Sequence, residues 1–425
     1  MRQYDSGVIN MSTSEECLQP EGEQVPAQCH DISVDEYRRR VEVLKEAMRR
    51  KRVDVALIQQ SRDLYYYSGT SLYCFLVVPR DGEPVLLVRI NLPRAREESW
   101  IADIRGSSGL GDVKRVFGEL DLGRAVVGIE EDVTTVGFQK KLAGLLPGAS
   151  FVGITPLILD QRMVKSPSEV AHVRRAAYIS NIGLRRAASV LRSGITEMEL
   201  AAELESAKLM AGHDGAMMSR QNAAASGSNF VTSGINVGIV SGYWIASTGT
   251  GPSAALPYGP SLRKVRAGDL VCIDHATMYR GYHSDEGRTF VVGKARDKQK
   301  KLFDVVRRAQ DAAIALVGPG VPAAEVYRAA WRVAKDAGYE EYFMAYGQYG
   351  VEYLGHGLGL EIDEPPLVGP RTTTLLQEGM TLALEPKLII PGWGAVDLED
   401  TLVVTGDGCE VLTQGKRELV EVKRG

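Results

Sequence analysis

Five side chains with metal-binding atoms lie in the second half of this 425-residue chain: Asp274, Asp285, His356, Glu385 and Glu399. The carboxylates stand in or directly after segments that are typical of strands, where an ionised carboxylate is costly unless it is paired or bound to a metal. Such a set suits two metal ions roughly 3.5 to 4 Å apart, bridged by carboxylates and by a hydroxide that serves as the nucleophile. The pattern therefore predicts a two-metal hydrolytic centre.

The donor types narrow the choice of metal. Carboxylates outnumber imidazole, and none of the five cysteines belongs to the set. We therefore expect two divalent ions, with Mn first and Co, Fe or Zn as alternatives. For any one of these residues alone, a solvated or capping carboxylate is the commoner meaning, but the order and context of all five favour metal binding.

A hairpin is expected to position the two aspartates. Residues 270–277 and 282–290 are typical of two strands, and Gly281 offers a turn between them. Pairing of these strands would bring both aspartates to one end of one surface.

The other three residues stand in different contexts. Closely spaced glycines around His356 let the backbone approach a ligand and leave the imidazole unobstructed. Glu385 ends the apolar run 380–384, and Glu399 interrupts a strand-like segment over residues 395–404. These elements must converge if the five residues form one centre.

The same segments resemble the pita-bread metallohydrolases, which include methionine aminopeptidase, prolidase (Xaa-Pro dipeptidase), aminopeptidase P and creatinase. The resemblance covers the chain from about residue 34 to its C-terminus, and all five metal-ligand positions of the family are filled, unlike those of metal-free creatinase. The matching segments are residues 162–176, 268–274, 281–290, 355–361, 378–386 and 398–405.

The resemblance implies an α+β chain with a C-terminal pita-bread catalytic domain preceded by a smaller α/β creatinase-like domain. We expect a flexible tail over residues 1–32, the creatinase-like domain over 33–160 and the metallohydrolase domain over 161–425. Short strands are predicted at residues 53–58, 74–78, 84–88 and 125–129.

The second domain has clear helix starts. Ser166 with Glu169 and Thr196 with Glu199 form capping-box signatures.

The resemblance further implies that the first domain supports oligomerisation and shapes the substrate pocket, so we expect a homodimer.

Departures from the prolidase pattern bear on the substrate. Where peptidase members have two histidines that bind substrate and stabilise the reacting carbonyl, this chain has Tyr258 and Asp363, and Gly287 replaces a frequent threonine. Tyr258 retains a hydroxyl donor, whereas an ionised Asp363 only accepts hydrogen bonds. Three roles for Asp363 stay open: it would hold a substrate cation, accept a proton, or cap the turn before Pro365.

The remaining histidines are not expected to bind metal. His275 follows Asp274 and faces the opposite side of an extended strand, and His283 lies one strand repeat from Asp285. His30, His172 and His213 are expected to be solvated on a tail or on helix surfaces.

Charge and hydropathy argue against a nucleic-acid-binding protein and a membrane-spanning protein. The net charge of −4 gives no basic field that would attract nucleic acid. The sequence contains no apolar run long enough to be typical of a membrane span. The scattered cysteines favour free thiols in a reducing cytoplasm.

The leading hypothesis is a dinuclear metal-dependent hydrolase that resembles Xaa-Pro dipeptidases and cleaves an amide bond in a dipeptide or short peptide. Glu385 would relay the proton, and His356, Tyr258 and Asp363 would act on the substrate. Two alternatives stay open. One is a metal-dependent hydrolase or lyase acting on a small zwitterionic amino-acid derivative, and the other is a catalytically silent binding protein.

Overall fold

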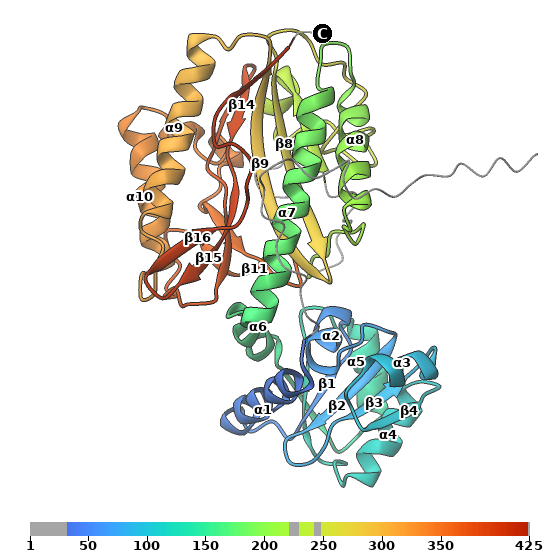
Figure 1. Cartoon of the computed structure of the whole chain (residues 1–425). Helices are drawn as coiled ribbons and strands as arrows, with labels where there is room; N and C mark the ends of the chain where they lie inside the picture. The colour runs from blue at the N-terminus through green and yellow to red at the C-terminus, as the bar shows by residue number, and fades with distance from the viewer. Residues whose placement is uncertain (1–31, 221–228, 242–247, 424–425) are drawn as a thin grey trace, which may run out of the picture.

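The computed structural model describes residues 32–220, 229–241 and 248–423. Figure 1 shows a smaller body built from the N-terminal residues and a larger body built from the C-terminal residues, with helix α6 (Thr155–Met163) between them. The predicted tail falls outside the described residues except for Ile32, which is buried.

A six-stranded sheet forms the smaller body, with the strand order β4-β3-β2-β1-β5-β6. The four predicted strands are confirmed as the first, second, third and fifth strands along the chain. Their apolar side chains form strands here because both faces of the sheet are covered. The strands are β1 (Val55–Ile58), β2 (Cys74–Pro79), β3 (Val85–Val88), β4 (Asp103–Gly106), β5 (Val126–Ile129) and β6 (Ser150–Gly153). The helices are α1 (Val34–Lys51), α2 (Ser61–Ser68), α3 (Leu92–Glu98), α4 (Leu110–Glu119) and α5 (Val136–Leu145).

Two capped helices open the larger body. Helix α7 (Pro167–Val190) begins after Ser166 and helix α8 (Glu197–Met210) begins after Thr196, and each has the reciprocal side-chain and backbone hydrogen bonds of a capping box. Both predicted helix starts are therefore confirmed.

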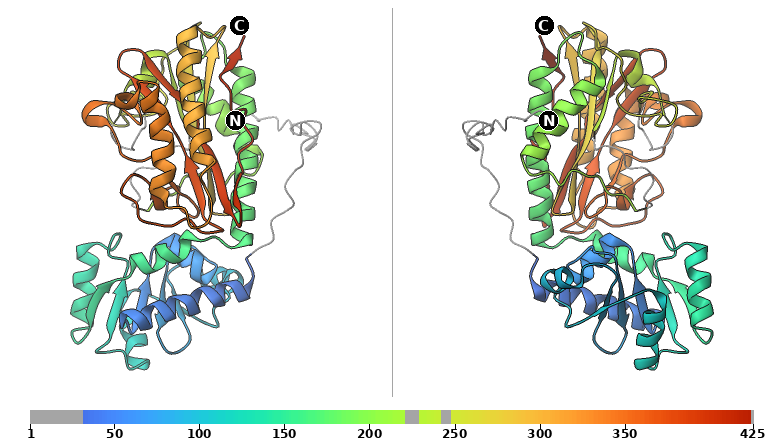
Figure 2. Two further views of the ribbon diagram at one scale, coloured as in Figure 1. Left: turned by 90° about the vertical axis from the view of Figure 1, so that its left-hand side faces the viewer. Right: turned by 90° about the vertical axis from the view of Figure 1, so that its right-hand side faces the viewer.

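Three sheets lie between two helix pairs in the larger body, with α7 and α8 on one side and α9 and α10 on the other (Figure 2). The helices of the second pair are α9 (Asp297–Ile314) and α10 (Ala323–Asp336). The first sheet has the order β17-β9-β8-β7, the second has the order β11-β10-β12-β15-β16, and β13 pairs with β14. This arrangement confirms the predicted α+β class.

The strands of the larger body carry or flank the predicted metal ligands. Their bounds are β7 (Asn229–Ser233), β8 (Leu270–Tyr279), β9 (Tyr282–Val292), β10 (Gly355–Gly357), β11 (Glu364–Val368), β12 (Thr381–Leu384), β13 (Lys387–Ile390), β14 (Gly394–Asp397), β15 (Asp400–Thr405), β16 (Gly408–Val411) and β17 (Val420–Val422). Short 3-10 turns cover Gly234–Gly238, Glu340–Tyr342 and Gly347–Tyr349.

Two sequence predictions are wrong. The strand expected over residues 395–404 is divided into β14 and β15, because Glu399 pairs its backbone with Gly287 of β9 between them. His172 and His213 are buried instead of solvated. His172 stacks on the Tyr282 ring with 5.4 Å between centroids, and His213 bonds to the backbone of β8. His30 lies outside the described residues.

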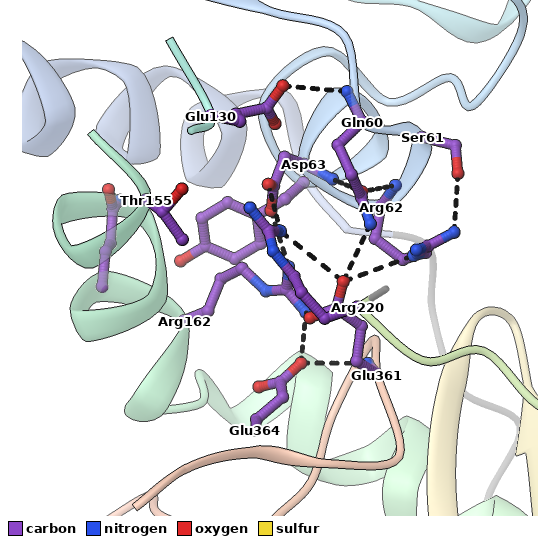
Figure 3. Close-up of polar contacts among 12 residues, drawn as sticks. Gln60, Ser61, Arg62, Asp63, Glu130, Thr155, Arg162, Arg220, Glu361 and Glu364 are labelled. Atoms are coloured by element: carbon purple, nitrogen blue, oxygen red, sulfur yellow. Dashed lines mark hydrogen bonds and ion pairs between the residues drawn. The ribbon is translucent and has the colours of Figure 1, made fainter. Parts of the chain in front are cut away.

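A buried cluster of charged side chains joins the two bodies (Figure 3). At its centre is Arg162 of α6, which is 2 % exposed. Its guanidinium donates to Asp63 of α2 at 2.6 Å and to Glu364 at the start of β11, and lies 3.1 Å from Glu361. Lys165 adds a 3.1 Å ion pair to Glu364. The smaller body is thereby tied to the chain segment that begins β11.

Glu361 receives further donors at this interface. Gln60 Nε2 donates to Glu361 Oε1 at 2.9 Å, Arg62 Nε donates to the same oxygen at 3.4 Å, and Arg220 Nη1 lies 3.6 Å from it. Because Asp363 lies between Glu361 and Glu364 in the chain, the ion pairs of these two residues restrain the backbone that carries this predicted substrate residue.

The Glu364→Gln variant is expected to lower the free energy of unfolding by about 3 kcal/mol at neutral pH, because Arg162 and Lys165 stay buried with one negative charge removed. Thermal or urea unfolding of the variant and wild type measures this loss. Glu410→Gln is the matched control, since it removes an exposed ion pair to Arg174, and its expected loss is below about 1 kcal/mol. Equal losses in the two variants would contradict the role given to the cluster.

The same variant has a defined pH dependence. Burial alone would raise the pKa of Glu364, but Arg162 and Lys165 lower it from 4.5 to about 2. Because the pKa is lower in the folded chain, this stabilisation is complete above about pH 4.5 and is lost as the pH falls towards 2. We expect the difference in stability between wild type and Glu364→Gln to shrink across that window, and a constant difference would argue against it.

Candidate metal centre

The β8–β9 hairpin presents the two aspartates on one face of the first sheet. Arg280 and Gly281 form its turn, both with positive φ angles. Asp274 is opposite Gly287 and Asp285 is opposite Ala276 in the register, so the aspartates are diagonal neighbours on the same face. The predicted hairpin is confirmed.

The absence of a side chain at Gly287 leaves room for Asp397 and Glu399, which come later in the chain. A Cβ atom at this position would lie 2.7 Å from Asp397 Oδ2 and 2.9 Å from Glu399 Cβ. The backbone of Glu399 bonds to that of Gly287 in both directions, at 3.0 and 3.2 Å. The glycine thus allows two acidic side chains to approach Asp274.

Glycines also set the position of His356 in β10. A Cβ at Gly355 would lie 1.9 Å from the carbonyl oxygen of Ala383 in β12, and one at Gly357 would lie 2.2 Å from that of Pro365. These glycines allow β10 to pack closely against neighbouring backbone, not against a ligand. In this position of β10, His356 Nε2 lies 4.0 Å from Asp285 Oδ2.

Two groups of ligand atoms emerge, with all atoms of a group within 4.8 Å of one another. One group consists of Asp285, His356 and Glu399, and the other consists of Asp274, Asp397 and Glu399. Glu399 belongs to both, as a bridging carboxylate would. Buried oxygens of Asp285, Asp397 and Glu399 have no hydrogen-bond partner. This donor set fits two divalent ions.

Glu385 follows β12 and lies beside His356 of the first group. Its Oε1 is 3.7 Å from His356 Nε2, and its Oε2 is 2.9 Å from the ammonium of Lys387. The structure thus brings all five predicted ligands together and adds Asp397, which sequence reasoning missed. Asp397 could have been found because residues two apart on an extended strand share a face, and Glu399 is two residues away.

Lys387 is the other residue that the sequence reasoning missed. It is opposite Asp397 in the β13–β14 pair and two residues after Glu385. Its Nζ lies 2.8 Å from Asp274 Oδ2 and 3.7 Å from Asp397 Oδ2. A cation of the chain itself therefore stands among the carboxylates.

Crowding of carboxylates changes the protonation of the metal-free centre. Burial and neighbouring carboxylates raise the pKa of Asp285 and Glu399 well above the usual range, and burial raises that of Asp397 to about 8. Burial would lower the pKa of His356, but Asp363, Glu385 and Asp285 raise it to about 9. Metal binding must therefore release protons.

The two residues that replace family histidines lie near this centre. Asp363 Oδ1 is 3.5 Å from His356 Nε2, and the Asp363 side chain is 45 % exposed. The buried Tyr258 ring lies 6.0 Å from that of Phe230, which is opposite Asp274 in the β7–β8 pair. Asp363 lies directly beside a candidate ligand, and Tyr258 packs against Phe230.

His275 and His283 have other surroundings, in line with their exclusion from the predicted ligand set. His275 Nε2 lies 3.5 Å from Ser180 Oγ of α7. His283 Nδ1 is 2.9 Å from the carbonyl oxygen of Gly359, and its Nε2 accepts from the Met218 backbone at 3.0 Å.

Comparisons with known proteins agree with this architecture. Residues 171–406 match Metallopeptidase family M24, and residues 40–164 match the Creatinase/Prolidase N-terminal domain. The Xaa-Pro dipeptidase of Pyrococcus horikoshii is 30% identical over 91% of this chain and 100% of the relative. The Xaa-Pro dipeptidase structure from Bacillus anthracis has a TM-score of 0.80 at 25% identity, covering 91% of this chain and 100% of that one.

A second solved structure, the prolidase from Pyrococcus horikoshii, has a TM-score of 0.77 at 29% identity, with coverage of 90% and 100%. These likenesses extend through both bodies and confirm the expected creatinase-like and pita-bread arrangement. The chain belongs to metallopeptidase family M24 and is a metal-dependent hydrolase that resembles the Xaa-Pro dipeptidases.

Proposed function

We propose that this chain hydrolyses the amide bond of Xaa-Pro dipeptides or closely related short peptides. The observation that carries the proposal is the pair of ligand groups that share Glu399. Similarity to Xaa-Pro dipeptidases over nine-tenths of the chain supports the substrate class.

The proposed ligands are Asp274, Asp285, His356, Glu385 and Glu399, together with Asp397. Mn is the proposed metal, with Co, Fe or Zn as alternatives, because carboxylate oxygens dominate the donor set. When bound, such ions polarise a carbonyl group and lower the pKa of water.

Glu385 is the proposed proton carrier. Its Oε1 lies 3.7 Å from His356 Nε2 and its Oε2 lies 2.9 Å from the Lys387 ammonium, so the carboxylate stands beside a proposed metal ligand. It would accept the proton of the attacking water and give it to the amine nitrogen as the C–N bond breaks. His356 and Tyr258 would orient the substrate, Tyr258 through its hydroxyl donor.

Asp363 is the proposed anchor for the substrate's free ammonium group. The carboxylate is partly exposed, lies beside His356, and accepts hydrogen bonds when ionised. A dipeptide has a free ammonium one residue from the scissile bond. Within the described residues, no backbone amide donates to this carboxylate, which favours a substrate role over the turn cap.

Two further proposals concern the setting of the enzyme. The described cysteines Cys74, Cys272 and Cys409 are free thiols, which supports a reducing cytoplasm. A homodimer is proposed from the role of the N-terminal domain in this family. No described helix is both long and apolar enough to cross a membrane.

Mn- or Co-loaded enzyme is expected to cleave a panel of Xaa-Pro dipeptides, and a chelated sample is expected to be inactive. Release of free proline measures the reaction. Non-proline amides and betaine-like zwitterions form the comparison panel. Activity confined to that second panel would replace the Xaa-Pro proposal with the zwitterion alternative, and bound metal without activity on either panel would reject both.

Asp363→Asn is expected to raise KM for dipeptides by about tenfold with a smaller change in kcat, because the ammonium loses its charged partner. N-acetylated dipeptides lack that ammonium and should lose little. Steady-state kinetics on both substrates measures the difference, and Asp407→Asn, at an exposed turn, serves as the matched control. Unchanged KM values with reduced thermal stability would favour the turn cap instead.

A further inference from the structure

The ammonium of Lys387 lies among carboxylates that are proposed metal ligands. Its Nζ lies between two carboxylate oxygens, at 2.8 Å from Asp274 Oδ2 and 2.9 Å from Glu385 Oε2, with Asp397 Oδ2 at 3.7 Å. The side chain is 5 % exposed, so water does not screen these contacts. An ammonium has three donors and no acceptor, and it faces three carboxylates here.

This ammonium affects the two ligand groups unequally. Asp274 and Asp397, which both contact Lys387, belong to one group. The Asp285–His356–Glu399 group has no ion pair with it among the described residues. An ion entering the Asp274 group must compete with Lys387 for direct contacts, whereas an ion entering the other group meets the Lys387 charge only at longer range.

A small cavity and a cross-strand carboxylate border the side chain of Lys387 on the strand that carries it. A small cavity beside Lys387 is lined by Asp274, Asp397, Cys272, Val237 and Ile389. Asp397 is the cross-strand neighbour of Lys387, so the side chain can turn to Asp397 alone without leaving its strand.

Charge balance also favours retention of Lys387 in the loaded centre. Five carboxylates gather here: those of Asp274, Asp285, Glu385, Asp397 and Glu399. Two divalent ions leave one negative charge over, a bridging hydroxide would add a second, and the Lys387 ammonium offsets one of them. The Lys387–Asp397 pair is thus compatible with two bound ions.

We propose that Lys387 is an intrinsic cation of this centre, which holds the Asp274 group in place of the second metal ion until that ion displaces it. The two positions then load in sequence. The Asp285–His356–Glu399 position fills first, and the Asp274–Asp397–Glu399 position fills at higher free metal. This inference rests on the metal centre proposed above.

The test counts bound Mn against free Mn by elemental analysis of wild type and Lys387→Met. Wild type is expected to bind one ion and then a second at a free Mn concentration at least about tenfold higher. In Lys387→Met the second ion should bind at least about tenfold more tightly than in wild type. Lys294→Met removes an exposed ion pair to Glu421 and should follow the wild-type curve.

Two further variants guard against misfolding and assign the steps. Lys387→Met/Asp397→Asn removes both members of the cross-strand pair and keeps the net charge, so it should fold, and its second ion should bind more weakly than that of Lys387→Met because the proposed ligand Asp397 is also lost. Asp285→Asn should weaken the first step. In chelator, Lys387→Met should have a lower midpoint of thermal unfolding than wild type, and added Mn should restore it.

Different failures point to different errors. If wild type and Lys387→Met bind two ions along the same curve, the intrinsic-cation proposal is wrong and the metal centre stands. If no variant binds metal, the proposed metal centre and this inference are both rejected.

Discussion

Repulsion among buried carboxylates is the constraint on which this structure depends. Two unit charges about 4 Å apart repel by about 4 kcal/mol at the effective dielectric of a protein site. The ligand atoms of each group lie within 4.8 Å of one another, and one carboxylate belongs to both groups. A few such repulsions rival the whole stability of a typical domain, about 5 to 15 kcal/mol. The fold can hold this set only with protons, metal ions or cationic side chains among the carboxylates.

The scaffold brings the acids together through close backbone contacts. Gly287 admits Asp397 and Glu399 to the face of the hairpin, and Gly355 lets β10 pack against β12. At the junction of the two bodies, Arg162 pairs with Asp63 of the smaller body and with Glu361 and Glu364, which flank Asp363 in the chain. The proposed metal ligands and the proposed substrate anchor are therefore held largely by different interactions.

Local signals in the sequence predicted the local structure well. Ser166 and Thr196 begin helices because a capping box satisfies backbone donors within one turn, and Gly281 turns the hairpin because it tolerates a positive φ angle. The four acidic ligand candidates could be named because acids in or next to strand-like segments stand out, and His356 because closely spaced glycines flank it. Their pairing partners are distant in the chain, so no local pattern could show that Glu399 leaves its strand to bond with Gly287.

Cationic residues were the main omission. Lys387 and Arg162 have ordinary sequence contexts, and only the three-dimensional structure shows each among buried carboxylates. His172 and His213 were wrongly expected at the surface, because a helix pattern does not reveal which face a second element covers. Asp397 was within reach of a period-two argument from Glu399.

Anomalous diffraction from crystals equilibrated with saturating Mn is the most direct test of the two-position centre. Two Mn peaks are predicted, one bounded by Asp285, His356 and Glu399 and the other by Asp274, Asp397 and Glu399, with the Glu399 carboxylate between them. A single peak, or peaks that do not contact Glu399, would contradict the account.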